Sequence, residues 1–389
     1  MNTKAKFLFC CFFLSLIAFE SKSQVRIGED NRVITSTVPF LNISPDARSA
    51  AMGDAGAAIT PDANSVHWNP GKIVFAEAEM GASVNFTPWL GKIVDDMSIS
   101  YLSGYKKIDD LNAVALEIRY FDLGDIFLFD EVNGLPVEAG QVSPREFSIG
   151  GNYSRKLSEN LGIGVSLRFI NSNITKGIAS LDDNKAASTV AGDIGVYYTK
   201  DVQIGSKTSN LSWAGSISNI GGKITYLNEG TKDFIPTNLK LGTAFKTHFD
   251  PYNTITFALD FNKLMVPTPP IRDENGNVIE GKDDDRSVIS GMFGSFGDAP
   301  DGFSEELKEI SIAFGTEYWY NNVFAARAGY FYENEDKGDR KYFSVGLGFR
   351  YQVFGIDFAY LIPTEQEHPL AETLRFSLLF SFEEKGSSL

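Results

Sequence analysis

Long runs of the chain between residues 79 and 382 alternate between apolar and polar side chains. The segment KYFSVGLGFRY, residues 341–351, places on one face Phe343, Val345, Leu347, Phe349 and Tyr351, and on the other Ser344, Gly346, Gly348 and Arg350. The segments 161–170 and 374–382 repeat the pattern. Because successive side chains of a β-strand point to opposite faces, this period of two indicates strands with one apolar face.

The same alternation predicts fourteen strands. They lie near residues 79–88, 95–105, 110–121, 145–155, 159–170, 190–200, 210–220, 236–247, 253–263, 310–319, 322–332, 341–351, 354–362 and 372–382. An even number of strands, most of them long enough to cross a bilayer at a tilt, is typical of bacterial outer-membrane barrels. Aromatic residues such as Trp89, Tyr101 and Trp319 gather near the strand ends, as they do at the membrane interfaces of such barrels.

The connections between these strands alternate in length. Those after even strands are short, whereas the longest ones follow odd strands and cover 122–144, 171–189, 221–235 and 264–309. Short periplasmic turns and long outer loops are typical of outer-membrane barrels. The sequence therefore predicts an all-β fold, a 14-stranded antiparallel outer-membrane β-barrel over residues 79–382, with a periplasmic tail at 383–389. A soluble sandwich of two sheets is the alternative, but it leaves the alternation of loop lengths unexplained.

The first residues have the order of a secretory signal peptide. Two lysines precede an apolar run over residues 7–19, and small residues follow it. Because this run is too short to span a bilayer, a cleaved signal peptide at 1–23 is favoured over an N-terminal anchor. We therefore expect the protein in the outer membrane of a Gram-negative cell. Cys10 and Cys11 both lie in this segment, so the mature chain would have no disulfide and no cysteine metal site.

Residues 24–78 differ from the strands that follow. The stretch PDARSAAMGDAGAAITPDANSVHWNPG (45–71) is rich in Ala and Gly and ends in Trp68, Asn69, Pro70 and Gly71. A barrel of fourteen strands is too wide to fill its own interior, and irregular backbone at membrane depth must be shielded by protein. We therefore expect 24–78 to form an N-terminal plug inside the lumen, threaded from the periplasmic side. A short helix capped by Ser44 and closed by Gly53 or Gly56 is expected within it. A disordered periplasmic tail is the alternative.

Charged residues occur on the inward faces of the predicted strands. They are Glu117, Arg119, Arg168, Asp193, Asp260, Glu317, Arg327, Arg350, Asp357 and Arg375. Because buried charges need partners, we expect a paired network that holds the plug, for example with Asp357 bound to Arg350 or Arg375. The other inward residues are mainly small and polar, which disfavours a conduit for fatty acids, since such a conduit needs an apolar lining.

The overall charge and the histidines limit the possible chemistry. A net charge of −15 argues against a nucleic-acid partner. The histidines His67, His248 and His368 lie in no catalytic or metal-binding pattern. Only His368 has the depth that a lipid-modifying barrel enzyme would need, and no orienting carboxylate is evident beside it. The sequence thus indicates no catalytic residue, no metal site and no cofactor.

Acidic residues dominate the longest outer loop, 264–309. A solvated surface is the simplest interpretation of this charge. The loop also contains apolar side chains that a spacer would not need, and we expect these to be exposed and to contact a protein partner. They are Met265, Val266, Ile289, Met292, Phe293 and Phe296. Within the same loop, Asn275-Gly276 predicts the tip of a hairpin.

The plug segment carries a resemblance to a known family. PFLNISPDARSAAMGDAGAA (39–58), followed by NSVHWNPG (64–71), resembles the N-terminal plug of the FadL-like outer-membrane barrels. It is closer still to the PorV branch, a component of the type IX protein secretion system. The Asn-Pro-Gly at 69–71 corresponds to the element that ends the FadL-type plug. The likeness extends over the plug, the strands and the acidic outer loops.

The resemblance implies a function in protein secretion rather than an enzyme. It implies a barrel, surrounded by outer-membrane lipid, that binds the C-terminal signal domains of secreted proteins. It also implies association with a large outer-membrane translocon barrel and delivery of cargo to a surface attachment complex. A FadL-like transporter of long-chain fatty acids or other hydrophobic small molecules is the alternative. A lipid- or lipopolysaccharide-modifying barrel enzyme ranks third.

Overall fold

The computed structural model describes residues 32–91, 94–132, 135–174, 185–205, 207–228, 230–364 and 373–383. The predictions for the signal peptide (1–23), for His368 and for the tail after residue 383 fall outside the described residues. Part of the predicted outer loop 171–189 falls outside them as well.

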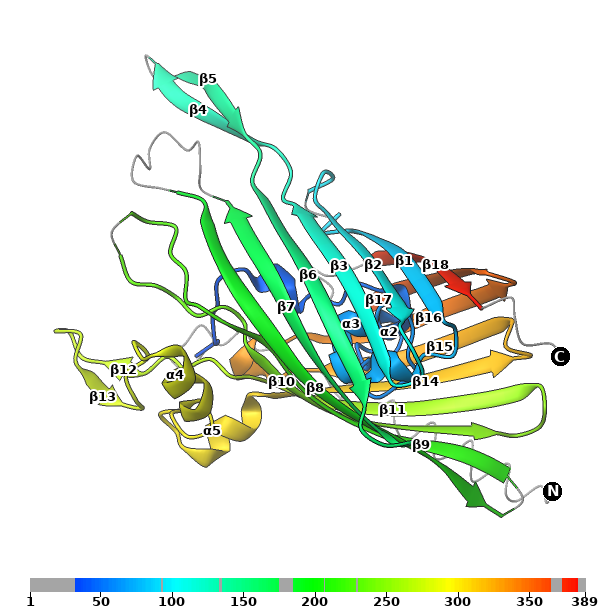
Figure 1. Ribbon diagram of the computed structural model, residues 1–389. Helices are drawn as coiled ribbons and strands as arrows, with labels where there is room; N and C mark the ends of the chain where they lie inside the picture. Colours follow the sequence, from blue (N-terminus) through cyan, green and yellow to red (C-terminus); the bar gives the residue numbers. More distant parts are fainter. Residues whose placement is uncertain are drawn as a thin grey trace, which may run out of the picture. The chain divides into compact units, whose positions relative to one another are not determined.

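Fourteen β-strands form a closed barrel (Figure 1). Neighbouring strands pair antiparallel, and the first strand closes the barrel against the last. The wall strands are β1 (Met80–Pro88), β2 (Ser98–Lys107), β3 (Asn112–Asp122), β6 (Arg145–Lys156), β7 (Leu161–Asn173), β8 (Ala187–Ile204), β9 (Lys207–Gly221), β10 (Asn238–His248), β11 (Asn253–Leu264), β14 (Ile310–Tyr320), β15 (Phe324–Tyr332), β16 (Lys341–Tyr351), β17 (Phe354–Pro363) and β18 (Leu374–Phe382). The prediction of an all-β, 14-stranded antiparallel barrel is confirmed.

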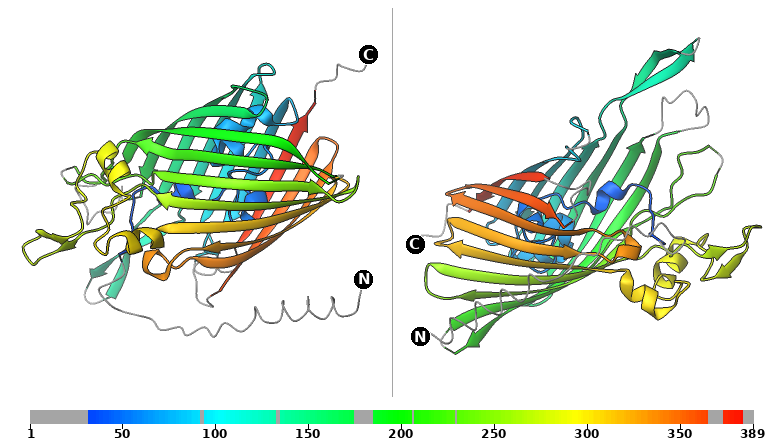
Figure 2. Two further views of the ribbon diagram at one scale, coloured as in Figure 1. Left: turned by 90° about the horizontal axis from the view of Figure 1, so that it is seen from below. Right: turned by 180° about the vertical axis from the view of Figure 1, so that it is seen from behind.

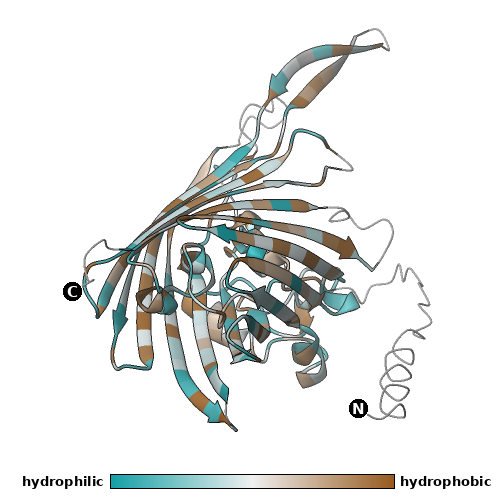
Figure 3. Cartoon of the chain, turned by 90° about the vertical axis from the view of Figure 1, so that its right-hand side faces the viewer, coloured by the Kyte–Doolittle hydropathy of each residue, from teal (hydrophilic) through white to brown (hydrophobic). Residues whose placement is uncertain are grey.

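The two faces of the wall differ in polarity. On β18, Arg375 and Ser377 point inward and are buried, whereas Leu374, Phe376 and Leu378 point outward. Figure 3 shows the resulting alternation of hydrophobic and hydrophilic residues along the strands. A barrel with an apolar outer face is stable where that face meets lipid instead of water. This arrangement points to the outer membrane.

The two ends of the barrel also differ (Figures 1 and 2). The elements at one end are the hairpin of β4 (Ile126–Val132) and β5 (Leu135–Val142), the strands β12 (Ile271–Arg272) and β13 (Val278–Glu280), the helices α4 (Val288–Gly294) and α5 (Phe303–Lys308), and η3 (Glu335–Lys337). The connections at the other end are short. By the rule for bacterial barrels, this short-turn end faces the periplasm and the long-loop end faces outward.

Several elements differ from the sequence expectation. β8 and β9 continue beyond their predicted ends, because their pairing runs on from Asp201↔Asn210 to Ile204↔Lys207. The outer loop 122–144 contains the hairpin of β4 and β5, which was not predicted. The hairpin tip predicted at Asn275-Gly276 is present between β12 and β13.

The plug fills the lumen of the barrel (Figures 1 and 2). Its helices are η1 (Pro39–Asn42), α2 (Ala47–Ala50), α3 (Ser65–Trp68) and η2 (Pro70–Phe75). Phe40, Met52 and Ile73 are completely buried. In the described part of the chain no helix is both long and apolar enough to cross a membrane. Residues 32–78 are thus an internal plug and not a disordered tail.

The short helix expected in the plug is present with a different cap. The N-cap of α2 is Asp46, whose side chain accepts a hydrogen bond from Ser49 N (2.8 Å). Ser44 was the predicted cap, but its hydroxyl oxygen has no hydrogen-bond partner. Asp and Ser cap helices about equally well, so the residue that stands next to the helix takes the role. Gly53, with φ of 67°, follows α2 as predicted.

Candidate functional site

The motif at residues 68–71 connects α3 to η2 and docks the plug on the wall. The Asn69 side chain donates to Val196 O on β8 (2.9 Å) and accepts from the backbone N–H two residues on (2.9 Å). Pro70 lies in the first turn of η2, where its missing N–H costs no hydrogen bond. A Cβ on Gly195 of β8 would lie 2.2 Å from Asn69 Oδ1, so the wall needs glycine where the motif contacts it.

Trp68 of this motif joins two helices of the plug. Its Nε1 donates to Asp46 Oδ1 (2.6 Å), while the second oxygen of Asp46 caps α2. Gly56 lies against the indole ring, and a Cβ there would be 2.2 Å from Trp68 Cδ2. Both Asp46 and Trp68 are buried. The tryptophan is therefore a packing and hydrogen-bonding element of the plug.

Five alternating charges link the plug to the wall. Arg48 of α2 binds Glu317 of β14 (2.8 Å), which also binds Arg327 of β15 (2.8 Å). Arg327 binds Asp357 of β17 (2.8 Å), and Asp357 binds Arg350 of β16 (2.7 Å). We call these five residues the Arg48 network. All of them except Arg350 are buried, so each charge depends on its neighbours for stabilisation.

Two further arginines hold the plug by its backbone. The sequence expectation paired Asp357 with Arg350 or Arg375. The first pairing is confirmed, whereas Arg375 of β18 instead donates to Ser44 O. Arg119 of β3 donates to two backbone carbonyl groups of η1, at 2.7 Å each. Its Nη2 lies 2.8 Å from His67 Nδ1, and because a guanidinium can only donate, Nδ1 is the acceptor.

A second group of buried charges lies within the wall itself. Arg168 of β7 binds Glu117 (2.7 Å) and Asp193 (2.6 Å). Tyr101 donates a further hydrogen bond to Glu117 (2.7 Å). Asp193 stands where the register between β8 and β9 shifts, and it accepts from Asn219 N (2.7 Å). The expected pairing of inward charges therefore holds on this side of the barrel too.

Asp260 of β11 binds the plug backbone directly. Its Oδ2 accepts from Gly56 N (2.9 Å) and from Ala57 N (2.8 Å). On the other side of the same peptide segment, Lys72 Nζ donates to Gly56 O (2.6 Å). Hydrogen bonds to a charged group are the stronger class, so this contact fixes the middle of the plug.

The N-terminal end of the plug lies among the long loops. Arg32 pairs with Glu305 of α5 (2.9 Å) and with Asp301 (2.5 Å), and Lys337 of η3 also pairs with Glu305 (2.6 Å). Burial alone would raise the pKa of Glu305, but the hydrogen bonds from Arg32 and Lys337 outweigh it and lower the pKa to about 2. The described plug thus starts at the long-loop end and reaches the short-turn end only where it enters β1. This differs from the expected entry on the periplasmic side.

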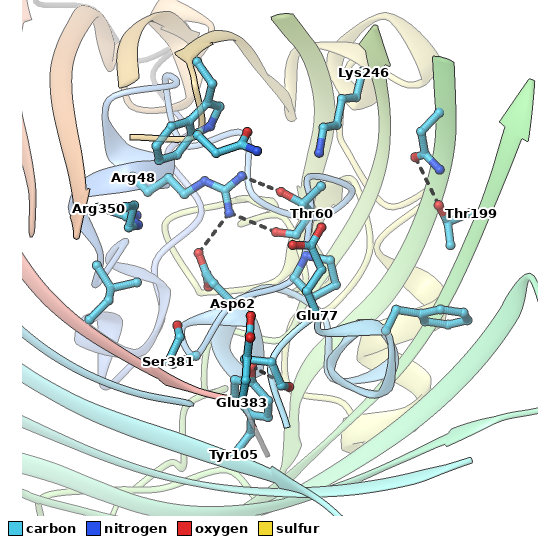
Figure 4. Close-up of a pocket in the computed structure, with 18 of the residues that line it drawn as sticks. Arg48, Thr60, Asp62, Glu77, Tyr105, Thr199, Lys246, Arg350, Ser381 and Glu383 are labelled. Atoms are coloured by element: carbon cyan, nitrogen blue, oxygen red, sulfur yellow. Dashed lines mark hydrogen bonds and ion pairs between the residues drawn. The ribbon is translucent and has the colours of Figure 1, made fainter. Parts of the chain in front are cut away.

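Two cavities border the plug, and both are lined by a mixture of charged, polar and apolar residues. The larger, about 570 Å³, lies at the short-turn end, and its lining includes Arg48, Asp62, Lys246 and Arg350 (Figure 4). The smaller, about 110 Å³, lies toward the long loops, and its lining includes Lys240. A hydrophobic ligand needs a largely apolar pocket. Neither of these two cavities, as the described residues form them, provides one.

The six apolar residues proposed for partner contact fall into two groups. Ile289, Phe293 and Phe296 are 59%, 63% and 46% exposed. Met265, Val266 and Met292 are only 2% to 3% exposed, which corrects the expectation that all six are accessible. The chain after β11 stays bonded to the residue before β10, with Met265 N donating to Thr237 O (2.8 Å). This bond keeps the start of the loop inside the fold.

Sequence reasoning missed a second apolar surface at the long-loop end. The hairpin of β4 and β5 projects from the barrel (Figure 1) and exposes Phe127, Phe129, Leu135 and Val137. The available signal was the dipeptide Asn133-Gly134 between short alternating runs, which favours a hairpin turn.

The histidines in the described residues have structural surroundings. His67 contacts Arg119, and His248 Nδ1 lies 2.9 Å from Thr254 Oγ1. Across residues 32–383, where they are described, no group of three or more His, Cys, Asp or Glu side chains is placed to hold a metal ion.

Comparisons with known proteins identify one family. A family model described as "Type IX secretion system protein PorV" matches residues 26–271. Among solved structures, the toluene transporter TbuX of Ralstonia pickettii aligns with a TM-score of 0.46 and 10% identity, covering 88% of this chain and 100% of its own. The toluene transporter TodX of Pseudomonas putida gives 0.47 and 14%, covering 87% and 99%. A Pseudomonas aeruginosa FadL homologue gives 0.42 and 10%, covering 91% and 100%. No curated protein sequence matches significantly.

Proposed function

Because the chain belongs to the PorV family of type IX secretion system proteins, we propose that it is an outer-membrane subunit of this secretion machinery. In this proposal it binds the C-terminal signal domains of secreted proteins and associates with a large translocon barrel. It then shuttles the cargo to a surface attachment complex. The family match supports the role in secretion, and the individual steps extend that role.

The observation that carries the proposal is the lumen, which is filled by a firmly attached plug. The plug is fastened by the Arg48 network and by arginine bonds to its backbone. Both cavities beside it include several charged residues in their linings. A barrel filled in this way resembles a scaffold more than a conduit, and its elaborate surfaces lie at the long-loop end. This arrangement supports a protein-binding function.

The alternatives receive less support. A FadL-like transporter of long-chain fatty acids needs a largely apolar pocket, and the charged residues in both cavities beside the plug argue against it. We also propose that the protein is not an enzyme. His368, the one histidine at the depth that a lipid-modifying barrel enzyme would need, lies outside the described residues.

In this proposal the partner contact includes the exposed apolar residues of the longest loop. Ile289 and Phe293 lie on α4, and Phe296 follows it. We call these three residues the α4 patch. Large apolar and aromatic side chains within a polar surround are the usual anchors of protein interfaces. The acidic residues around the patch match a basic partner surface.

The first test is native mass spectrometry of the tagged protein, extracted from its own outer membrane in mild detergent. The proposal predicts a very large membrane protein, or secreted proteins that share a C-terminal domain, bound to the barrel. Recovery of the barrel alone, carrying fatty acids, would instead favour the transporter.

A matched pair of variants tests the α4 patch. Ile289→Ser with Phe293→Ser should reduce partner recovery by about tenfold or more, the effect of losing interface anchors. The control is Phe249→Ser, since Phe249 is 52% exposed in a short turn at the opposite end. Unchanged partner recovery with the double variant would show that the α4 patch is not the partner contact.

A further inference from the structure

Most inward-facing glycines of the wall have a clear structural cause. A Cβ on Gly329 would lie 2.1 Å from Gly53 N of the plug, and one on Gly164 would lie 2.4 Å from Pro70 O. A Cβ on Gly315 would lie 2.5 Å from Met52 O. The plug backbone therefore approaches the wall where only glycine leaves room.

Three outward-facing glycines lack such a cause: Gly104, Gly151 and Gly215 of β9, where a Cβ would come no closer than 3.6 Å to another atom. A Cβ on Gly104 of β2 would come no closer than 3.4 Å to another atom, and one on Gly151 of β6 no closer than 3.7 Å. Both distances are ordinary van der Waals contacts, so an added Cβ would meet no clash at either position. Glycine weakens a strand, and Gly104 and Gly151 stand out because they line the same part of the outer face.

The strand register places the small residues in a row across the outer face. Ala82 pairs with Gly104, Gly104 with Leu116, and Leu116 with Gly151. Ala82, Gly104 and Gly151 form the floor of a groove of about 830 Å³, and Leu116, which is 70% exposed, stands as a ridge between the two glycines. The outward-facing residues that line it are Met80, Ala82, Gly104, Lys106, Val114, Leu116, Gly151, Tyr153, Val165, Leu167 and Phe382. All of them except Lys106 are apolar, aromatic or glycine.

Lys106 marks one end of the groove. It is exposed next to the last residue of β2, on the outer face, close to a short turn. Its ammonium group makes no ion pair or hydrogen bond with any described residue, and its backbone pairs within the sheet. Arg155, also exposed, follows Tyr153 on the same face of β6. An apolar groove on a lipid-facing wall thus ends in positive charge at the level of the periplasmic headgroups.

We propose that this groove binds one phospholipid of the periplasmic leaflet with an anionic headgroup. One acyl chain lies over Gly151, between the ridges of Leu116 and Leu167, and the other lies over Gly104, on the opposite side of Leu116. The phosphate meets Lys106. The volume falls within the range of ordinary ligand pockets, and the single unpaired lysine supplies the charge complementarity that a phosphate requires. The site is separate from the α4 patch, so it does not depend on the proposed function.

Native mass spectrometry with defined lipids tests the site on the purified full-length barrel. Dioleoylphosphatidylglycerol is the anionic probe and dioleoylphosphatidylcholine the zwitterionic one. The wild type should retain one phosphatidylglycerol in preference to phosphatidylcholine. Lys106→Gln should reduce that preference by about fivefold, the factor expected for one lysine at an anionic membrane surface. Gly104→Leu with Gly151→Leu should abolish retention of the lipid, because leucine fills the groove.

The matched control places the same change on the opposite part of the wall. Ala326 and Ala328 are exposed on the outer face of β15, so Ala326→Leu with Ala328→Leu leaves the groove intact. The shift in gel mobility on heating verifies that each variant is folded. Equal lipid retention by the wild type and the groove-filled variant would overturn the proposal. So would loss of a co-purified membrane protein, rather than of lipid, on filling the groove, since the groove would then be a protein interface.

Discussion

Arg48 Nη2 lies 2.8 Å from Glu317 Oε1, and this pair joins the first α-helix of the described plug to the wall. The two side chains are 6% and 1% exposed, so the contact is shielded from water. Glu317 also binds Arg327, and the chain of charges continues to Arg350 near the short-turn cavity. The plug is thus tied to four wall strands through a single side chain.

Replacing Arg48 should weaken the barrel substantially. Arg48→Ala leaves Glu317 bound to Arg327 alone and leaves a void beside Asp62. Loss of one partner from a buried ion pair typically costs about 3–5 kcal/mol. This change is measured as a shift in the urea concentration at the midpoint of unfolding. The heat-dependent gel shift serves as the signal for the folded barrel. Arg272→Ala is the control, because Arg272 pairs only with exposed acids of the outer loop and such pairs contribute about 0–1 kcal/mol. Equal midpoints for both variants would contradict the role assigned to Arg48.

Adding side chains at the plug-facing glycines should displace the plug. In Gly329→Val the first added carbon would lie 2.1 Å from Gly53 N, and backbone on both sides prevents relief. Overpacking of this kind costs about 1–3 kcal/mol or more. Limited proteolysis of the plug reports the displacement. Gly215→Val on the outer face, where the nearest atom is 3.6 Å away, should leave the plug as protected as in the wild type. If the plug of Gly329→Val stays protected from proteolysis, the contact between residues 329 and 53 can accommodate a larger side chain, and the prediction is wrong.

The attachment of the plug to α5 should depend on acid pH. The pKa of Glu305 is lowered from 4.5 to about 2, so its ionised form is favoured by the folded state. Ionised Glu305 therefore stabilises the fold at pH values above about 4.5, the ordinary pKa. This contribution is lost as the pH falls from about 4.5 toward 2. We expect a spin-label pair at Val33 and Ser304 to separate over this range. In Glu305→Gln the separation should be independent of pH, and a transition at the same pH in that variant would assign it to another group.

The direction of the plug predicts which end of the chain is accessible from outside. Val33 is 40% exposed beside Arg32 at the long-loop end. Because both native cysteines lie in residues 1–23, Val33→Cys offers a single site once those residues are removed. A membrane-impermeant maleimide should label it in intact cells. Phe249→Cys, in a short turn, should react only after permeabilisation. The reverse result would invert the orientation of the barrel.

Much of the wall could be predicted because the pattern of a strand depends on residues that are close together in the sequence. Alternation in a segment such as 374–382 depends only on neighbouring residues, and the strand count and the loop asymmetry follow from repeating that pattern. The pairing of Asp357 with Arg350 was also accessible, because the two strands are consecutive and their turn is short. The plug was recognisable from its small residues and its closing motif.

The remaining features depend on contacts between distant parts of the chain. Arg48 binds Glu317, and Arg375 binds Ser44 O. These partners can be predicted only when the position of the plug inside the closed wall is known. The same holds for the start of the plug at the long-loop end. Met265 is hidden because its backbone bonds to Thr237, a residue of another loop. No local pattern in the sequence carries this information.

The course of the plug through the lumen constrains the order of assembly. The wall closes only when β1 pairs with β18, so the last strand of the chain must be available before a sealed barrel exists. The plug runs from Arg32 at the outer end to β1 at the periplasmic end, and the inner glycines leave no space for it to slide. Threading it into a finished wall would mean drawing one end through the whole length of the lumen. We infer that the strands close around a plug already in place, so the plug serves as the internal template on which the barrel is completed.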